Sequence, residues 1–394
     1  MPWEQLTDEQ LEIRQLVRTL ARDRIAPRAA EIDESHEFPW DVVELYREHG
    51  IFGLLFDEEH GGTGTGTLLV LVAIEEVSKV CATSGLILAV QELGSLGLKL
   101  AGSEEQRARF LPGLASGEVL AAYALTEAGS GSDSAAMRTT ARRDGDEYIL
   151  DGSKRFITNA SVAGLYTVFA KTDPEAGHSG ISAFVVEAAG TPGFEVARLE
   201  PKMGIAGSTT GELTFDAARI PAVNLLGEEG DGFRIAMRIL DRSRPGVAAQ
   251  GLGIAQGATD YALEYARTRE TMGKPIAEHQ LIAGKLADME TRCEAARGLL
   301  YRFGRMVDEG ADDAELTKAS AMAKLYCTDT AMDVTTEAVQ ILGGYGYIRE
   351  YPVERMMRDA KITQIYEGTN EIQRLVIARE MLKESRAFLL AGVA

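Results

Sequence analysis

Tyr166-Thr-Val-Phe-Ala170 and Ile181-Ser-Ala-Phe-Val-Val-Glu187 are two short apolar runs, separated by a polar segment that includes Pro174 and Gly177. Short runs rich in β-branched and aromatic residues, bounded by Gly, Pro and Asp, are typical of strands. The same pattern continues over residues 119–227. These runs therefore predict a β domain in the middle of the chain.

No long helical pattern separates the strands of this domain. Parallel neighbours need a long crossover, which is usually a helix, so an antiparallel arrangement is favoured. Asp151-Gly152 lies between two apolar runs and is typical of a turn. We expect a compact antiparallel β-barrel over residues 121–230.

Helical periodicity dominates on both sides of the β domain, where apolar residues recur at three- and four-residue steps. Proline is expected to break the first helix at Pro27, to close a short surface helix at Pro112 and to break or kink a long helix at Pro245. The predicted helices cover residues 6–25, 68–79, 86–100, 104–111, 233–269, 281–307, 316–342 and 370–389. The chain is thus predicted to be an α+β multidomain protein, with an all-α N-terminal domain (1–120), the barrel (121–230) and a helical C-terminal domain (231–394).

Acidic residues outnumber basic residues by 60 to 41, which gives a formal net charge of -19. Such a surface repels phosphate backbones and anionic lipid, so we expect no nucleic-acid partner and no membrane partner. Residues 1–10 carry acids where a signal peptide would carry bases. The three cysteines lie far apart without metal-ligand spacing, which fits a cytoplasmic protein and argues against a metal site.

Several familiar motifs are absent from the sequence. The glycines of residues 61–66 lack the Rossmann spacing, and there is neither a Walker loop nor a Gly-x-Ser-x-Gly elbow. The five histidines are scattered, which disfavours a Ser-His-Asp triad. A dinucleotide bound through the usual βαβ fold is therefore not expected.

Four other segments have unusual polar patterns, and each also has an ordinary structural explanation. The first, Tyr123-Ala-Leu-Thr-Glu-Ala-Gly-Ser-Gly-Ser-Asp133, is rich in hydroxyls and backbone donors but is equally typical of a hairpin turn. Phe156-Ile-Thr-Asn-Ala160 fits a core strand followed by a turn, and Gln340-Ile-Leu-Gly-Gly-Tyr-Gly346 fits a glycine helix cap.

The fourth segment is Ile365-Tyr-Glu-Gly-Thr-Asn-Glu-Ile-Gln373. Asn370 or Thr369 can cap the following helix, with Gln373 completing a capping box if Asn370 is the cap. Glu367 lies just before that helix, between an aromatic residue and a glycine. A carboxylate there is usually solvated, but burial among apolar neighbours would raise its pKa and make it a general base for a carbon acid.

Taken in order, these segments resemble the acyl-CoA dehydrogenase family over nearly the whole chain. The most specific part is Met357-Arg-Asp-Ala-Lys361 followed by Ile365-Tyr-Glu-Gly-Thr369. The resemblance implies an N-terminal helical domain, a middle β-barrel and a C-terminal four-helix bundle. It also implies noncovalently bound FAD, shared between the subunits of a homotetramer built as a dimer of dimers.

The resemblance further implies which residues contact FAD. One group would lie against the flavin ring and a second would reach the adenosine diphosphate half across a subunit interface, where a guanidinium, an amide and glycine backbone suit a pyrophosphate. The implied flavin contacts are Tyr123, Leu125, Thr126, Gly131, Ser132, Phe156, Ile157, Thr158, Thr369 and Glu371. The implied diphosphate-half contacts are Arg269, Thr271, His279, Gln280, Gln340, Ile341, Gly343 and Gly344.

For the acyl-CoA, the resemblance implies contacts from Ser132, Asp241, Ser243, Arg244, Tyr366 and Gly368. An ordinary helical pairing with Asp241 would explain Arg244 as well. Some members of the family place their base on this helix, but Ser243 at that position cannot act as one, so the role stays with Glu367.

The implied reaction is α,β-dehydrogenation of an acyl-CoA to a trans-2-enoyl-CoA. Glu367 removes the α proton while the β hydrogen leaves as hydride to flavin N5, and the enolate oxygen is held by the base's own backbone N–H and a flavin ribityl hydroxyl. No metal is required. The electrons would pass to an electron-transfer flavoprotein, in the breakdown of fatty acids or branched-chain amino acids.

Two alternatives stay open. A short acyl-CoA oxidase would pass electrons to O2, and a specialised dehydrogenase would act on a carrier-protein thioester. A non-catalytic flavin-binding protein would be expected to lose Glu367 or the flavin loops, and this chain keeps both. Residues 202–221 look most like short-chain and branched short-chain members of the family, which favours acyl chains of about four to six carbons.

Overall fold

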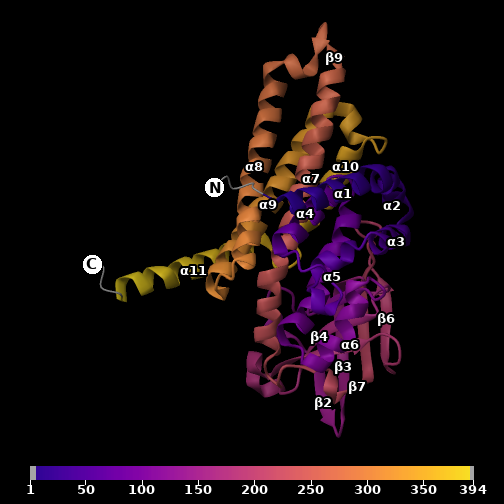
Figure 1. Cartoon of the computed structure of the whole chain (residues 1–394), viewed down its shortest axis with the longest axis vertical. Coiled ribbons are helices and arrows are strands. Elements are labelled where there is room, and N and C mark those ends of the chain that lie inside the picture. Colours follow the sequence, from indigo (N-terminus) through magenta and orange to yellow (C-terminus); the bar gives the residue numbers. More distant parts are fainter. Residues whose placement is uncertain (1–5, 391–394) are drawn as a thin grey trace.

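The computed structural model describes residues 6–390 as an elongated molecule, with a sheet at one end and long helices running to the other (Figure 1). Residues 1–5 and 391–394 lie outside the described part, and so does the first half of the acidic segment 1–10. The order of helices, strands and helices is the order predicted from the sequence.

The N-terminal part is helical. Two of its helices begin with a capping box, in which Thr7 accepts the N–H of Gln10 and Ser103 accepts the N–H of Gln106, while each glutamine side chain accepts the N–H of the cap residue. The helices are α1 (Asp8–Leu20), α2 (Ala29–Ser35), α3 (Trp40–Glu48), α4 (Thr67–Ser78), α5 (Ala82–Ala101) and α6 (Glu104–Ala115).

Helices α4 and α5 form the buried centre of the molecule. Every residue from 68 to 78 is buried, and most of α5 is buried as well. Gly94 of α5 brings the sheet close, because a Cβ at this position would lie 2.5 Å from the Cβ of Ala121 on the first strand. The helical part and the sheet therefore share one packed boundary.

One eight-stranded sheet makes up the middle part, with strand order β6-β7-β3-β2-β4-β5-β8 and β1 paired to β4. A separate small core of Tyr148, Tyr166, Phe184 and Phe215 lies within it. The strands are β1 (Ala121–Ala124), β2 (Thr140–Asp144), β3 (Glu147–Thr158), β4 (Leu165–Lys171), β5 (Ile181–Glu187), β6 (Phe194–Leu199), β7 (Thr210–Pro221) and β8 (Leu225–Leu226).

The prediction that this sheet is antiparallel throughout is wrong. Strand β1 runs parallel to β4, with Ala121 opposite Leu165, and β2 meets β4 in a parallel pairing at Thr140 and Lys171. The crossover from β1 to β4 contains a hairpin instead of a helix, which is why the lack of helices misled the prediction. The pairings of the described residues give a mixed sheet that ends at β6 and β8, not the closed barrel.

The predicted turn at Asp151-Gly152 is also wrong. Strand β3 continues through it with a bulge, and Gly152 has φ +143° where a Cβ would lie 2.7 Å from Thr139 Oγ1. The tight turn lies earlier, at Gly145-Asp146 between β2 and β3. Both sites carry an Asp-Gly pair, so the dipeptide alone does not tell a bulge from a hairpin.

The C-terminal part is helical again, apart from a two-stranded ribbon at the far end of the molecule (Figure 1). Helices α7, α8 and α9 pack on one another, while α11 packs against α9 and projects away from the body. The elements are α7 (Gly232–Thr268), β9 (Glu270–Thr271), β10 (Lys274–Pro275), α8 (Gln280–Asp308), α9 (Asp313–Leu342), α10 (Pro352–Thr363) and α11 (Asn370–Leu390). No helix within residues 6–390 is both long and apolar enough to cross a membrane.

Two prolines lie inside helices that continue past them. Pro112 is exposed within α6, which runs on to Ala115 on the buried side chains of Leu111 and Leu114, so the predicted end at Pro112 is wrong. Pro245 lies inside α7, which runs on to Thr268, so a break there is wrong; its turn is buried, and tertiary packing outweighs the hydrogen bond that the proline removes. At Pro27 the prediction is confirmed, because α1 gives way to a π-helical turn and then to a 3-10 turn that contains this proline.

Candidate active site

Glu367 lies in the tight turn between α10 and α11. Its backbone is left-handed at φ +55°, which is unfavourable for a residue with a side chain, and Gly368 follows at φ +90°. A Cβ on Gly368 would lie 2.7 Å from Nε2 of Gln373, so only glycine fits there. Such a conformation costs of order 1–3 kcal/mol and persists only where the surroundings hold it.

Three side chains hold this turn by its carbonyl groups. Lys324 Nζ donates to Gly368 O at 2.9 Å, and Gln373 Nε2 donates to the same oxygen at 2.8 Å. Gln373 and Arg244 each reach Glu367 O at 3.4 Å. Within residues 6–390 no protein acceptor binds the N–H of Glu367, so this donor is left for a ligand.

The Glu367 carboxylate accepts one short hydrogen bond, from Ser243 Oγ to Oε2 at 2.6 Å. Burial raises the pKa of Glu367 to about 6, although the Ser243 bond and the positive charges of Lys324 and Arg244 favour the ionised form. A carboxylate with a pKa near neutrality is ionised at physiological pH and still basic enough to accept a proton from carbon.

Arg244 lies buried next to this turn and pairs with Asp241 of its own helix, Nη1 to Oδ1, at 2.6 Å. Thr317 Oγ1 donates to the other oxygen of Asp241 at 2.6 Å. The ordinary helical pairing is therefore real, and the same guanidinium also contacts the Glu367 turn. Burial raises the pKa of Asp241 and lowers that of Arg244.

Two tyrosines complete the surroundings of Glu367. Tyr366 donates its hydroxyl to the buried Gln250. The hydroxyl of Tyr123 is buried and has no hydrogen-bond partner in the described residues. Its pKa is raised by burial and by the negative charge of Glu367, which shows that β1 lies within electrostatic reach of this carboxylate.

The two segments predicted to face a flavin lie together. Arg155 of β3 donates its N–H to Thr126 O at 2.8 Å, which ties the loop after β1 to the strand that carries Phe156, Ile157 and Thr158. Phe156 has φ +59° and is 57% exposed, and a Cβ on Gly131 would meet nothing within 4 Å. An exposed aromatic ring, open glycine backbone and the unpartnered Tyr123 hydroxyl fit the flavin that the sequence implies.

A buried ion pair beneath this loop was not predicted from the sequence. Glu127 Oε1 lies 2.8 Å from Lys154 Nζ, and its carboxylate also accepts the N–H groups of Arg138 and Thr139 at 2.6 and 3.0 Å. Lys154 donates to Leu125 O at 3.1 Å. The signal was a lysine at an inward-facing position of a strand, which is unusual without a partner.

The residues predicted for the diphosphate half of FAD gather elsewhere, at the end of α7. They line a cleft of about 670 Å³, in which Thr271 Oγ1 lies 3.3 Å from His279 Nε2 and the Arg269 guanidinium lies 5.4 Å from the centre of the Tyr345 ring. Ile341 and Gly344 also line this cleft. Gln280, Gln340 and Gly343 adjoin these residues in the chain.

Of the two predicted caps of α11, the structure has Thr369. Thr369 Oγ1 accepts the N–H of Ile372 at 3.4 Å, and Gln373 reaches back to the turn carbonyls, so the capping box that an Asn370 cap would have allowed is not formed. Asn370 is buried and bonds to Thr328 and Asp329 of α9. Glu371 lies at the start of α11, next to these residues.

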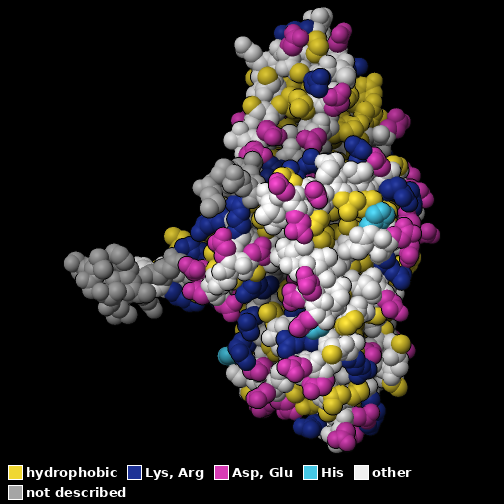
Figure 2. All heavy atoms as spheres, viewed as in Figure 1, with side chains coloured by type: hydrophobic (Ala, Val, Ile, Leu, Met, Phe, Trp, Pro, Cys, Tyr) yellow, Lys and Arg dark blue, Asp and Glu magenta, His cyan; other side chains and the backbone are white. Residues whose placement is uncertain are grey.

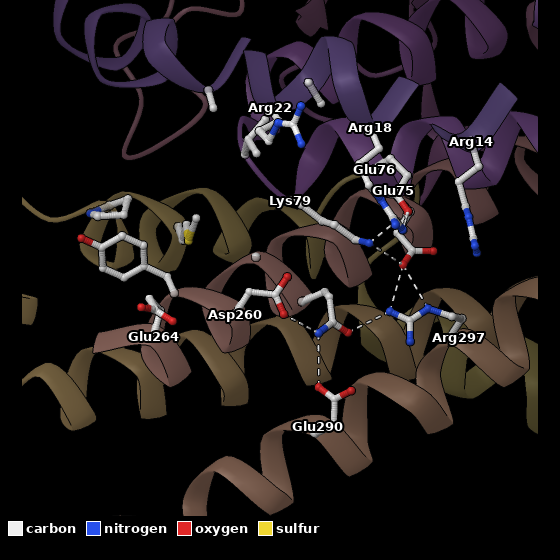
Figure 3. A pocket seen from close by; sticks show the side chains of 18 of the residues that line it. Arg14, Arg18, Arg22, Glu75, Glu76, Lys79, Asp260, Glu264, Glu290 and Arg297 are labelled. Carbon is white, nitrogen blue, oxygen red and sulfur yellow. Dashed lines mark hydrogen bonds and ion pairs between the residues drawn. The ribbon is translucent and has the colours of Figure 1, made fainter. Parts of the chain in front are cut away.

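A larger cavity, about 1210 Å³, lies between α1, α4, α7 and α8 and contains none of the predicted site residues. Figure 3 shows Glu75, Lys79 and Arg297 turned toward one another, while Arg14, Arg22 and Glu264 lie apart from them. Arg18 pairs with Glu76 at 2.7 Å, Lys79 with Glu76 at 3.1 Å and Arg297 with Glu75 at 2.9 Å. These ion pairs neutralise one another, so the cavity is lined by paired charges at the boundary between the two helical parts.

Comparison with known proteins follows the same division of the chain. Models of the N-terminal, middle and C-terminal domains of acyl-CoA dehydrogenases match residues 7–118, 122–218 and 230–382. An acyl-CoA dehydrogenase of Bacillus subtilis is 48% identical over 96% of this chain and 99% of its own length. A short-chain-specific acyl-CoA dehydrogenase of Clostridium acetobutylicum is 46% identical over 96% of this chain and 99% of its own length.

Solved structures give the same result for the fold. Butyryl-CoA dehydrogenase from Megasphaera elsdenii is 44% identical with a TM-score of 0.93, over 96% of this chain and 99% of that one. A chain from work on the electron-transferring flavoprotein of Acidaminococcus fermentans is 45% identical, with a TM-score of 0.94 and the same coverage. An acyl-CoA dehydrogenase from Bacillus anthracis complexed with FAD is 35% identical with a TM-score of 0.91, over 98% of this chain and 68% of that one.

Proposed function

The chain belongs to the acyl-CoA dehydrogenase family, and we propose that it oxidises an acyl-CoA to its trans-2-enoyl-CoA with Glu367 as the base. It is an enzyme of that family, and FAD is its cofactor. The observation that carries the proposal is the partly buried Glu367 carboxylate, with a pKa near 6, in a turn held by three side chains.

The chemistry divides between the protein and its cofactor. When bound, FAD supplies the acceptor for the hydride that leaves the β carbon. Glu367 takes the α proton on its carboxylate, and the α C–H electron pair becomes the new C=C bond as the hydride departs. The N–H of Glu367, which no protein group within residues 6–390 accepts, binds the thioester oxygen in this proposal as negative charge develops there.

The residues around Glu367 form the proposed acyl-CoA site. Tyr366 and Gly368 flank the base in the chain, and Ser243 and Arg244 touch it from α7. We propose these residues, with Asp241 and Ser132, as the acyl-CoA site. For the flavin site, we propose the contacts implied by the sequence. They come from the loop after β1, from residues 156–158 and from Thr369 and Glu371.

We also propose that two subunits share each FAD. Ser243 and Arg269 are 26 residues apart along α7, which at 1.5 Å per residue is about 39 Å, longer than one extended FAD. Thus one chain does not supply both halves of a single site. Figure 2 shows hydrophobic side chains gathered at the end of the molecule near β9, where Met272 and Leu281 are 94% and 85% exposed.

We further propose that the protein is a homotetramer and that it passes its electrons to an electron-transfer flavoprotein. Its domains are proposed to span residues 1–120, 121–230 and 231–394. The structural relative from Acidaminococcus fermentans, described with its electron-transferring flavoprotein, supports such an acceptor. The free cysteines Cys81, Cys293 and Cys327 fit the reducing cytoplasm. A preference for short acyl chains is supported by the butyryl-CoA and short-chain-specific relatives.

An anaerobic titration tests the reaction. The purified protein with FAD is mixed with butyryl-, isobutyryl-, octanoyl- and palmitoyl-CoA, and the flavin absorbance is followed. We expect one chain class to bleach the flavin, and Glu367→Gln to abolish bleaching with FAD still bound. A flavin that no acyl-CoA bleaches would refute the CoA assignment and favour a carrier-bound thioester, and reoxidation by air as fast as turnover would favour the oxidase.

A further inference from the structure

Lys324 is a buried cation that the reaction described above does not use. It lies in the middle of α9 with no exposed surface. Burying an ammonium group is costly unless its hydrogen bonds are made, and here Nζ donates to Gly368 O at 2.9 Å and to Asn370 Oδ1 at 2.8 Å. Both acceptors belong to the turn that carries Glu367.

The second acceptor is itself fixed. Asn370 Nδ2 donates to Thr328 Oγ1 at 2.9 Å and to Asp329 Oδ1 at 2.7 Å, both on α9. Lys324 therefore joins α9 to the C-terminal end of the left-handed segment formed by Glu367 and Gly368 and to the first residue of α11. Without such anchors the segment would relax toward a less strained backbone and take the Glu367 side chain with it.

The charge of Lys324 acts on the same carboxylate. The charged groups that act on it are Glu367 in the turn, Arg244 on α7, Glu371 on α11 and Asp329 on α9 itself. Burial lowers the pKa of Lys324 to about 7, while the negative charge of Glu367 opposes that shift. In return, the ammonium group lowers the pKa of Glu367.

We propose that Lys324 is a positioning residue for Glu367, which holds the strained turn by its carbonyl and supplies the positive charge that keeps the partly buried carboxylate ionised. The role as a positioner of the base rests on the proposed function. The effect on ionisation does not, because it concerns two side chains of this protein alone.

Gln373 makes it possible to separate the anchor from the charge. It donates to the same Gly368 oxygen but is neutral. Gln373→Leu thus removes an anchor only, Lys324→Met removes anchor and charge, and Lys324→Gln keeps a donor without the charge. Lys285→Met, a lysine of α8 paired with Glu337, gives the same change in net charge away from the turn.

The experiment measures the ionisation of Glu367 directly. Infrared difference spectra of the FAD-bound protein are recorded against pH, with Glu367→Gln in each background identifying the Glu367 band. We expect both neutral Lys324 variants to raise the midpoint by about one pH unit or more, because an opposite charge nearby lowers a carboxyl pKa by 1–3 units. Gln373→Leu and Lys285→Met should leave it within about 0.3 unit, and Lys324→Arg should restore it.

Flavin bleaching by acyl-CoA is then measured with each variant at high pH, where Glu367 is ionised in all of them. Lys324→Met and Gln373→Leu should still be slow, because the turn has lost an anchor. An unchanged midpoint in either Lys324 variant that folds would overturn the charge role, and wild-type bleaching rates in both anchor variants would overturn the positioning role. If the wild type is not bleached at all, the proposed function fails while the infrared midpoint still decides the effect on ionisation.

Discussion

At the scale of single residues, the hydroxyl of Ser243 controls how readily Glu367 loses its proton. This hydroxyl donates to the ionised carboxylate, and hydrogen bonds to charged groups contribute about 1.5–3 kcal/mol. Because the bond favours the ionised form, Ser243→Ala should raise the pKa of Glu367 by about one to two units. At pH 6 less base is then available, and the acid limb of kcat/KM moves to higher pH.

Ser320→Ala is the matched control for Ser243→Ala. Ser320 has a buried hydroxyl on α9 with no hydrogen-bond partner in the described residues. We expect its pH profile to match that of the wild type. A Ser243→Ala profile that stays in place, or moves toward lower pH, would contradict the role given to the hydroxyl.

Gly368 is the residue on which the shape of the turn depends. Gly368→Ala puts a Cβ in the left-handed region and against Gln373 Nε2, so the turn must change shape. We expect a loss of at least about 1 kcal/mol in stability and of about 100-fold in kcat, since small displacements of a reacting group are costly. Thermal melting and single-turnover flavin reduction measure the two effects.

Gly298→Ala controls for the added methyl group. Gly298 lies in α8, well away from Leu281, with open space around its Cβ direction, and alanine is the better helix former. This variant should be as active as the wild type and slightly more stable. Equal behaviour of the two alanine variants would show that the turn does not depend on glycine.

The position of Glu367 just before a helix could be predicted from the sequence, but much of what surrounds it could not. A carboxylate between an aromatic residue and a glycine, just before a helix, is a local pattern. Lys324 is different, because a lysine in a helix usually reaches solvent. Its burial depends on how α9, α7 and the turn pack together, and no local pattern records that packing.

At the scale of elements, the Glu127–Lys154 pair joins the loop after β1 to β3. Lys154 is fully buried and Glu127 nearly so. Removing one partner leaves an uncompensated buried charge, which costs about 3–5 kcal/mol. We expect Glu127→Gln and Lys154→Met each to lower the denaturant midpoint accordingly and to weaken FAD retention, because both flavin-facing segments lose their common anchor.

Arg219→Gln is the control for this pair. Arg219 pairs with Glu147 at the other end of β3, and both side chains are nearly half exposed. Exposed pairs contribute at most about 1 kcal/mol, so this variant should differ little from the wild type in denaturant unfolding and in bound FAD. If all three variants lost the same stability and the same amount of FAD, the buried pair would contribute no more than the exposed pair, and the prediction would be wrong.

Element boundaries were predicted best where periodicity was long. Helices α4, α8 and α9 follow their apolar spacing closely, whereas prolines and Asp-Gly pairs misled the prediction. Pro245 is overridden because its turn is buried, and Asp151-Gly152 becomes a bulge because Thr139 packs against the backbone there. Helix α10 was not predicted, although Pro352 at its first position and the spacing of Val353, Met356 and Ala360 would have indicated it.

At the scale of the whole molecule, the exposed apolar end near β9 is expected to lie in a subunit interface. Leu281→Asp places a charge there and should reduce both the oligomer mass and the FAD content, because the cleft at the end of α7 would lose the partner subunit. Light scattering after size exclusion, with flavin absorbance per chain, measures both quantities.

Val223→Asp is the matched control for the interface prediction. Val223 is 72% exposed and lies between β7 and β8, at the sheet end of the molecule. It should keep the wild-type mass and FAD content. A Leu281→Asp protein with unchanged mass and full FAD would refute the shared site.

Strand direction belongs to the whole molecule, and here the sequence was least informative. The pairing of β1 with β4 joins residues 44 positions apart, such as Ala121 and Leu165. Local patterns identify strands but not their distant neighbours. The order of the three parts was predictable because each part keeps one sequence pattern, helical or strand-like, over a hundred residues or more.

Helix α7 also restricts how this protein can change during evolution. It runs unbroken for 37 residues, from the neighbourhood of the base to the cleft near β9. One residue inserted between Ser243 and Arg269 would turn everything beyond it by about 100° and move it by about 1.5 Å, and so misalign the two ends at once. Insertions and deletions should therefore collect at the hairpin tip near Gly145, while the length of α7 stays the same among descendants of this gene.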